Sequence, residues 1–312
     1  MARPPRNPLI PTRDGVSPSS VALPLLPARE RRWATLLDFL GERLPAVGRE
    51  DWAMRLAAGE VLDDAGQAVR ADAPYQGGGR LHYWRALAAE PVVPFEAGVR
   101  YQDAHLLVAD KPHFLPVTPS GRFVQQTLLV RLKRATGIET LSPIHRIDRE
   151  TAGLVVFSVR PQDRGAYQAL FRERSVDKVY EAIAPHTDAL AWPQRRCSRI
   201  EEDPQAFYRM LETAGEANSE TTIAPVERRG AWARYRLAPL TGKRHQLRVH
   251  MNALGLPIAG DQFYPVVRRG PGEPEDFADP LRLLARAIAF TDPVTGEARR
   301  FESGLALDWP EA

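Results

Sequence analysis

The chain has a single cysteine among its 312 residues, Cys197. One cysteine excludes an internal disulfide and a zinc site built from several cysteines, and it fits the reducing cytoplasm. The sequence has no run of about eighteen apolar residues, so we expect neither a transmembrane helix nor a membrane partner. It also lacks a Gly-Lys-Ser/Thr phosphate loop, so we expect no nucleotide cofactor.

A strong excess of one charge is absent as well. The chain carries 42 Lys and Arg against 39 Asp and Glu, a net charge of +3. This balance permits an anionic partner without requiring one, because the clustering of charge matters more than its sum. A hydrophobic fraction of 44% is ordinary for a globular protein. The length suits one large domain with a small appendage.

Composition divides the chain into three segments. Residues 1–30 hold seven prolines without the apolar core of a signal peptide, and they predict a flexible arm. Residues 31–90 predict a small α/β appendage whose pattern weakly resembles an S4-like RNA-binding module. Its expected elements are two helices, 34–44 and 51–58, and two short strands, 59–62 and 79–83.

Residues 91–312 predict the main domain. Strand patterns outnumber helical ones and the two are mixed along the chain, which favours an α+β fold on a mixed, mainly antiparallel sheet. A loop rich in proline, glycine and acidic residues is expected at 264–280. The expected strands are 106–109, 176–184, 219–226, 231–238, 284–291 and 298–302, and the expected helices are 124–136 and 162–174.

The densest motif is His-Arg-Ile-Asp-Arg-Glu-Thr-Ala-Gly-Leu-Val-Val at residues 145–156. Gly153 allows the positive φ of a turn that enters a strand, and the apolar run after it predicts a buried strand. Asp148 therefore precedes a rigid strand, where a reactive carboxylate can be held in place. The simpler interpretation is a turn aspartate that caps its own backbone.

A second motif, residues 241–252, combines basic residues with a helical pattern. If the helix starts at about 244, His245, Arg248 and Asn252 share one face. The opposite, core-facing side would hold Leu247, Met251 and Leu254. The basic face can bind anions through guanidinium groups and free backbone N–H groups. The alternative is a basic face that only contacts solvent.

A third element, residues 177–182, predicts a strand on which Lys178, Tyr180 and Ala182 share one face. Taken alone, a tyrosine at this position is more commonly an ordinary aromatic residue of a strand.

The three motifs together resemble the RluA-type pseudouridine synthases. The first is similar to that family's His-Arg-Leu-Asp-x-x-Thr-Ser-Gly-Leu, with Ile147 and Ala152 as the departures. The second is similar to Thr-Gly-Arg-x-His-Gln-Ile-Arg-x-His and continues through Gly-Asp-x-x-Tyr at 260–264, with Lys243 replacing an arginine. The third matches Lys-x-Tyr-x-Ala. The resemblance covers residues 95–305.

The resemblance implies an enzyme that isomerises uridine in RNA, rRNA or tRNA, to pseudouridine without a cofactor. It implies that Asp148 is the catalytic aspartate and that Tyr180 stacks on the target base. Arg248 is the expected partner of Asp148, in bidentate geometry. The residues expected to contact RNA are His145, Arg146, Lys178, Lys243, Arg244 and His245.

Such a reaction breaks the C1′–N1 bond and rejoins the uracil through C5. Because a stacked base cannot be reached, the enzyme must flip it or take an unpaired one. An ionised Asp148 can attack C1′ or remove a proton from C2′, and the sequence does not separate these routes.

Two other functions are compatible with parts of the sequence. One is a catalytically inactive RNA-binding or RNA-folding protein on the same fold. The other is a glycosidase that uses Asp148 and Glu150, although nothing makes these two a facing pair. We expect no metal site, because His145, His245 and His250 come from distant segments and lack a carboxylate companion. We expect a cytoplasmic monomer.

Overall fold

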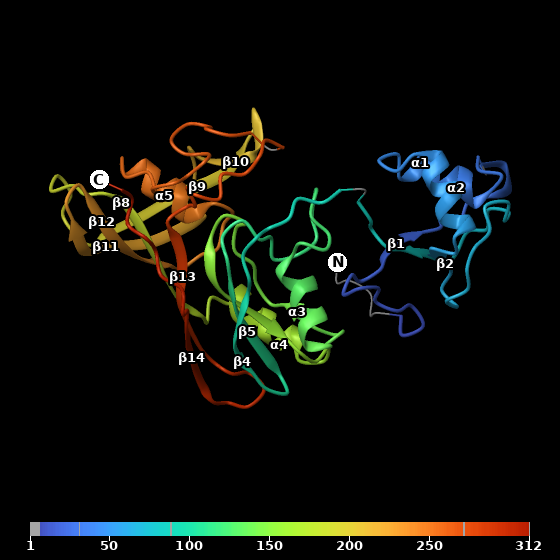
Figure 1. Ribbon diagram of the computed structural model, residues 1–312, viewed down its shortest axis with the longest axis horizontal. Coiled ribbons are helices and arrows are strands. Elements are labelled where there is room, and N and C mark those ends of the chain that lie inside the picture. Colours follow the sequence, from blue (N-terminus) through green and yellow to red (C-terminus); the bar gives the residue numbers. More distant parts are fainter. Residues whose placement is uncertain (1–6, 31, 88, 271, 312) are drawn as a thin grey trace. The chain divides into compact units, whose positions relative to one another are not determined.

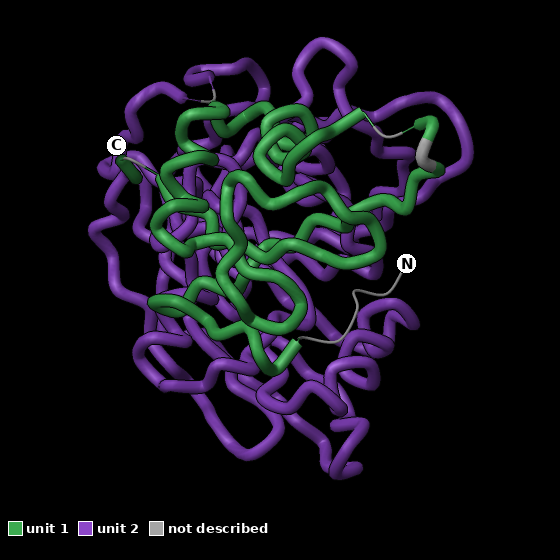
Figure 2. The backbone as a smooth tube through the Cα atoms, turned by 90° about the vertical axis from the view of Figure 1, so that its right-hand side faces the viewer, with its two compact units in different colours: residues 1–90 green, residues 91–312 purple. Residues whose placement is uncertain are grey.

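The computed structural model describes residues 7–30, 32–87, 89–270 and 272–311. The chain divides into two compact units, Met1–Glu90 and Pro91–Ala312 (Figure 2). Each unit encloses its own apolar core. Within the described ranges, no helix is long and apolar enough to cross a membrane.

The first unit joins two short helices to a three-stranded antiparallel sheet with the order β1-β3-β2. Thr35 and Asp38 form a reciprocal capping box that starts α1. Phe39 and Trp52 from the helices are fully buried against Leu81 from the sheet. The elements are β1 (Ser19–Ala22), η1 (Ala28–Glu30), α1 (Leu36–Arg43), α2 (Arg49–Ala57), β2 (Val61–Leu62) and β3 (Arg80–Tyr83).

The arm predicted over residues 1–30 contains regular structure within residues 7–30, and residues 1–6 lie outside the described part. Strand β1 pairs with β3 along its full length. Ile10, Val16 and Leu23 are buried. These apolar side chains lie between the prolines, so this segment folds into the first unit despite its composition.

The second unit is built on an eleven-stranded sheet (Figure 1). Its main path runs β10-β9-β11-β12-β8-β13-β7-β5-β4, and β14 and β6 pair with β13 and β7. All described pairs are antiparallel except β13 with β7. The elements are β4 (Gly98–Gln102), β5 (Leu106–Lys111), α3 (Leu128–Thr136), β6 (Ser142–Pro143), β7 (Ala152–Ser158), α4 (Arg164–Arg172), β8 (Asp177–Pro185), β9 (Gln194–Asp203), β10 (Ala206–Thr213), β11 (Ser219–Arg229), β12 (Trp232–Pro239), α5 (Gln246–Ala253), β13 (Leu283–Thr291) and β14 (Ala298–Glu302).

The predicted α+β class with a mainly antiparallel sheet is confirmed. The fully buried strands β5 and β7 and the alternating strand β12 lie where apolar patterns placed them. Strands β9 and β10 were not predicted, because β9 is mostly polar and β10 lacks an alternation of apolar and polar residues, and apart from Ile200 no side chain of either strand is fully buried. Their structure comes from pairing with each other and with β11 rather than from a local pattern.

Candidate active site

Asp148 lies in the loop between β6 and β7, directly before the buried strand. At the start of that strand, Gly153 has φ +108°, and a Cβ there would lie 2.3 Å from the carbonyl oxygen of Ala285 on β13. Only glycine permits this approach. In the register of the sheet, Gly153 pairs with Ala285, and Ala285 pairs with Tyr180 on β8. The close packing of β7 on β13 thus brings the aspartate loop near the tyrosine strand.

Helix α5 differs from its prediction. It begins at Gln246, and His245 before it adopts a left-handed φ of +54°. Every residue from Gln246 to Met251 is buried, which contradicts the alternative of a helix face that only contacts solvent. Strands β9, β10 and β11 and the segment after the helix pack against it and bury these residues, whereas Ala253 at the end of the helix is exposed.

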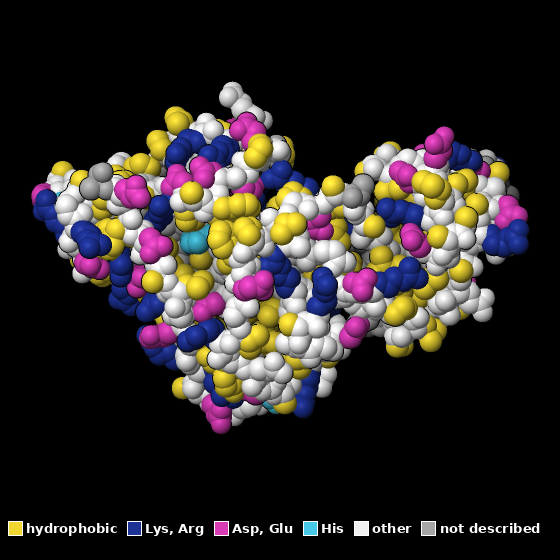
Figure 3. All heavy atoms as spheres, in the orientation of Figure 1, with side chains coloured by type: hydrophobic (Ala, Val, Ile, Leu, Met, Phe, Trp, Pro, Cys, Tyr) yellow, Lys and Arg dark blue, Asp and Glu magenta, His cyan; other side chains and the backbone are white. Residues whose placement is uncertain are grey.

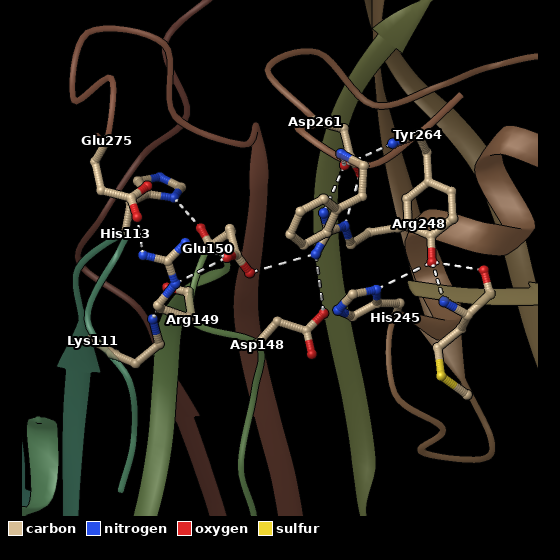
Figure 4. Close-up of polar contacts among 12 residues, drawn as sticks. Lys111, His113, Asp148, Arg149, Glu150, His245, Arg248, Asp261, Tyr264 and Glu275 are labelled. Atoms are coloured by element: carbon tan, nitrogen blue, oxygen red, sulfur yellow. Dashed lines mark hydrogen bonds and ion pairs between the residues drawn. The ribbon is translucent and has the colours of Figure 1, made fainter. Parts of the chain in front are cut away.

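Arg248 is 1% exposed and forms a bidentate pair with Asp261. Its Nε lies 2.8 Å from Oδ2 and its Nη2 lies 2.6 Å from Oδ1 of that aspartate. Its remaining nitrogen, Nη1, lies 3.8 Å from Oδ2 of Asp148 (Figure 4). The expected pairing with Asp148 is present, but the expected bidentate geometry belongs to Asp261 instead. Although burial opposes it, Asp261 and the other carboxylates raise the pKa of Arg248, so the group stays charged.

Glu150 connects Arg248 to a second arginine. Its Oε2 lies 3.5 Å from Nη1 of Arg248, and its Oε1 accepts hydrogen bonds from Nε and Nη2 of Arg149 at 3.1 and 2.8 Å. Burial alone would raise the pKa of Glu150, but Arg149 and Arg248 outweigh burial and bring that pKa to about 2. Glu150 is therefore a charged structural partner of the arginines.

A cavity of about 760 Å³ opens beside these residues. Asp148 lines it with a side chain that is 24% exposed, whereas the Arg248 side chain is 0% exposed. The carboxylate can therefore meet a ligand while the guanidinium behind it remains enclosed. The cavity is also lined by His145, Arg146, Arg174, Lys178, Tyr180, Arg199, Lys243 and His245.

Tyr180 reaches this cavity from the middle of β8. Burial and the negative charge of Asp148 raise the pKa of its phenol. The phenol is therefore protonated at neutral pH and available as a hydrogen-bond donor.

The basic residues predicted to contact RNA differ in whether they line the cavity and in whether protein groups already bind them. Arg146 is exposed at the cavity, and Lys243 also lines it. Lys178 donates from Nζ to the carbonyl oxygen of Thr241 at 3.0 Å, and burial and Arg174 lower its pKa to about 8. Arg244 is not among the lining residues. It donates to the carbonyl oxygen of Phe207 at 2.8 Å and lies 3.6 Å from Glu202.

The two predicted histidines pack against protein groups. His145 accepts a hydrogen bond from the Val156 N–H at 3.1 Å and stacks on Phe171. His245 is hydrogen-bonded through Nδ1 to the Tyr264 hydroxyl at 3.1 Å. Burial lowers the pKa of His145 to about 3 and that of His245 to about 4, so both rings are neutral. In the described part of the chain, no group of three or more His, Cys, Asp or Glu residues could hold a metal ion.

The sequence did not predict the roles of several residues of the site, although Glu150 was considered as a second carboxylate of a glycosidase. Glu150 lies in the motif at 145–156 and Asp261 in the continuation at 260–264, so their positions in these motifs could have marked them as candidates. Lys111 is completely buried, and its Nζ donates to the carbonyl oxygen of Arg149 at 2.9 Å, which fixes the aspartate loop. Burial lowers the pKa of Lys111 to about 7. Glu275 comes from the predicted loop at 264–280, and no motif marks it.

Comparison with known proteins agrees with this fold. The family model described as RNA pseudouridylate synthase matches residues 105–253. An uncharacterized RNA pseudouridine synthase of Synechocystis is 32% identical over 253 residues, covering 76% of this chain and 80% of the relative. The dual-specificity RNA pseudouridine synthase RluA of Haemophilus influenzae is 30% identical over 227 residues, covering 68% and 94%.

Among solved structures, human RNA pseudouridylate synthase domain containing 1 matches with a TM-score of 0.56 at 22% identity, covering 69% of this chain and 85% of that chain. Human RNA pseudouridylate synthase domain containing 4 matches with a TM-score of 0.50 at 25% identity, covering 68% and 88%. The main unit thus has the pseudouridine synthase fold. The chain belongs to the RluA-type family of RNA pseudouridine synthases, which are isomerases.

Proposed function

We propose that this enzyme isomerises specific uridines of structured RNA, rRNA or tRNA, with Asp148 as the catalytic carboxylate. The observation that carries the proposal is the position of Asp148. It is partly exposed to a large cavity and lies 3.8 Å from a fully enclosed guanidinium that Asp261 holds in place. A carboxylate oriented in this way by a fixed positive charge is suited to react with a bound ribose.

The cavity volume of about 760 Å³ is in the range of sites for small organic ligands, so a single flipped nucleotide fits it. In the proposed reaction the C1′–N1 bond breaks, a C1′–C5 bond forms, the hydrogen on C5 leaves as a proton and N1 takes up a proton, so the product is an isomer of the substrate. Asp148 acts either as the nucleophile at C1′ or as the base at C2′. Tyr180 offers a ring for stacking on the uracil and a phenol beside the reacting carbons.

The RNA backbone is expected to lie along the basic residues at the cavity. Arg146, Lys178 and Lys243 from the predicted set line it, as do Arg174 and Arg199. On the face visible in Figure 3, Lys and Arg are interspersed with Asp and Glu rather than gathered in one surface. Binding is therefore expected to depend on a few phosphate contacts near the target nucleotide and to weaken with salt.

The decisive experiment compares Asp148→Asn with the wild type. RNA is isolated from cells that lack this protein and were grown with [5-³H]uridine, because isomerisation releases the C5 tritium into water. We expect the variant to lose at least about a thousandfold in single-turnover rate, with RNA retention on filters unchanged. The exposed Asp177→Asn is the matched control. Release by Asp148→Asn at the normal rate would contradict the proposal. Absence of release by the wild type would favour the inactive RNA-binding alternative.

A further inference from the structure

Glu275 connects a distant segment to the site. It lies between Tyr264 and β13, and its side chain is 9% exposed. Its Oε1 lies 2.5 Å from Nη1 of Arg149 and 2.8 Å from Nη2 of Arg122. One carboxylate thus neutralises two guanidiniums that come from separate loops. Figure 4 shows Glu275 directed at Arg149 from outside the site.

From Arg149 the contacts lead inward. Arg149 holds Oε1 of Glu150, and Oε2 of Glu150 faces Nη1 of Arg248 at 3.5 Å. The same Nη1 is the atom that lies 3.8 Å from Asp148. Charges alternate at every step from Glu275 to Asp148, so each group has an oppositely charged neighbour that restricts its position.

We propose that Glu275 is a positioning residue for the isomerisation, and this proposal rests on the proposed role of Asp148. Without the carboxylate, the like charges of Arg122 and Arg149 repel each other and Arg149 leaves its present orientation. Glu150 then loses the partner that directs its second oxygen at Arg248. The guanidinium atom facing Asp148 is consequently less well fixed, and a small displacement of a catalytic group lowers the rate.

The test uses Glu275→Gln, which removes the charge but keeps the shape. The control is Asp276→Asn, the adjacent residue, which pairs with the partly exposed Arg269 at 2.8 Å and faces none of the site residues. Tritium release from the labelled RNA is measured with enzyme in excess. We expect Glu275→Gln to lower the rate at saturating enzyme about tenfold, or 1.4 kcal/mol in activation free energy. The enzyme concentration for half-saturation should not change, and Asp276→Asn should behave as the wild type.

A double-mutant cycle distinguishes a positioning role of Glu275 from a purely structural role in anchoring the loop at 264–280. If Glu275 acts through Glu150, Glu275→Gln causes no further loss of rate in a Glu150→Gln background. All rates are taken at a temperature where thermal melts show each variant folded. The proposal is overturned by a normal rate for Glu275→Gln, or by losses that multiply independently in the double variant. An active Asp148→Asn would instead overturn the proposed function itself.

Discussion

Arg248 makes its two shortest contacts with Asp261, at 2.6 and 2.8 Å, and reaches Asp148 only with Nη1 at 3.8 Å. The arginine is thus fixed by one aspartate and faces the other. Asp261 holds Arg248 in place, so Asp148 is not needed for that role. The Asp148 side chain remains partly exposed to the cavity. This division allows a carboxylate to change its bonding during a reaction while the positive charge behind it stays in place.

We predict that Asp261→Asn lowers both stability and activity. The substitution leaves the buried Arg248 without its main counter-charge, which should cost about 3–5 kcal/mol in the free energy of unfolding. The control is Asp72→Asn, because Asp72 forms a similar bidentate pair with Arg70 at 3.0 and 3.1 Å that is exposed to solvent. Loss of that exposed pair should change the stability much less, because solvent screens the two charges. Urea unfolding measures both, and equal losses would show that burial of the pair does not matter.

Tyr180 is predicted to have two separable roles. Tyr180→Phe keeps the ring and should bind RNA normally but release tritium much more slowly, because the phenol is missing. Tyr180→Leu should also weaken binding by roughly 1–3 kcal/mol, the contribution of stacking on a base. Filter binding and single-turnover rates measure the two effects. Full activity of the Phe variant would limit Tyr180 to stacking.

Gly153 should not tolerate a side chain. Gly153→Ala combines a positive φ with a Cβ 2.3 Å from the backbone of β13, so it should destabilise the protein by at least about 2 kcal/mol. Gly165→Ala is the control, because Gly165 lies in α4 and its added Cβ would meet no atom within 4 Å beyond its chain neighbours and the backbone of its own helix. It should instead stabilise by about 0.5–1 kcal/mol. Thermal melts of both variants measure the difference, and a stable Gly153→Ala would refute the argument.

Stability should fall as the pH falls below about 6.5, the pKa of an unperturbed histidine. Burial lowers the pKa of His250 to about 4, so between pH 4 and 6.5 the folded protein leaves this ring neutral while the unfolded chain protonates it. The unfolded state then binds more protons, and its free energy falls relative to the folded state. His145 and His245 act in the same direction.

His250→Gln should therefore reduce the slope of unfolding free energy against pH by about 1.4 kcal/mol per pH unit in this window. Urea titrations at several pH values measure the slope. The absolute stability of the variant will also change, since His250 is hydrogen-bonded to Ser198, Ser219 and Thr221. An unchanged slope would mean that His250 does not hold a lowered pKa.

The sequence alone determined the class of fold and the position of those site residues that local patterns place next to or on a strand. The apolar run after Gly153 predicts the buried β7 and places Asp148 directly before it, because the pattern and the glycine act over a few residues. Alternation along 177–182 likewise places Tyr180 on a strand. The family motifs, being contiguous in the chain, carry this local information directly.

Only the tertiary structure decided how the charges pair. Arg248 and Glu150 are 98 residues apart, and Arg149 and Glu275 are 126 apart, so no local pattern links them. The basic residues of 241–252 are compatible with a helix face that contacts solvent, yet the fold buries every residue from Gln246 to Met251. A buried arginine next to three carboxylates is stable only when the fold supplies all of its partners together, and that requirement is met by topology rather than by sequence spacing.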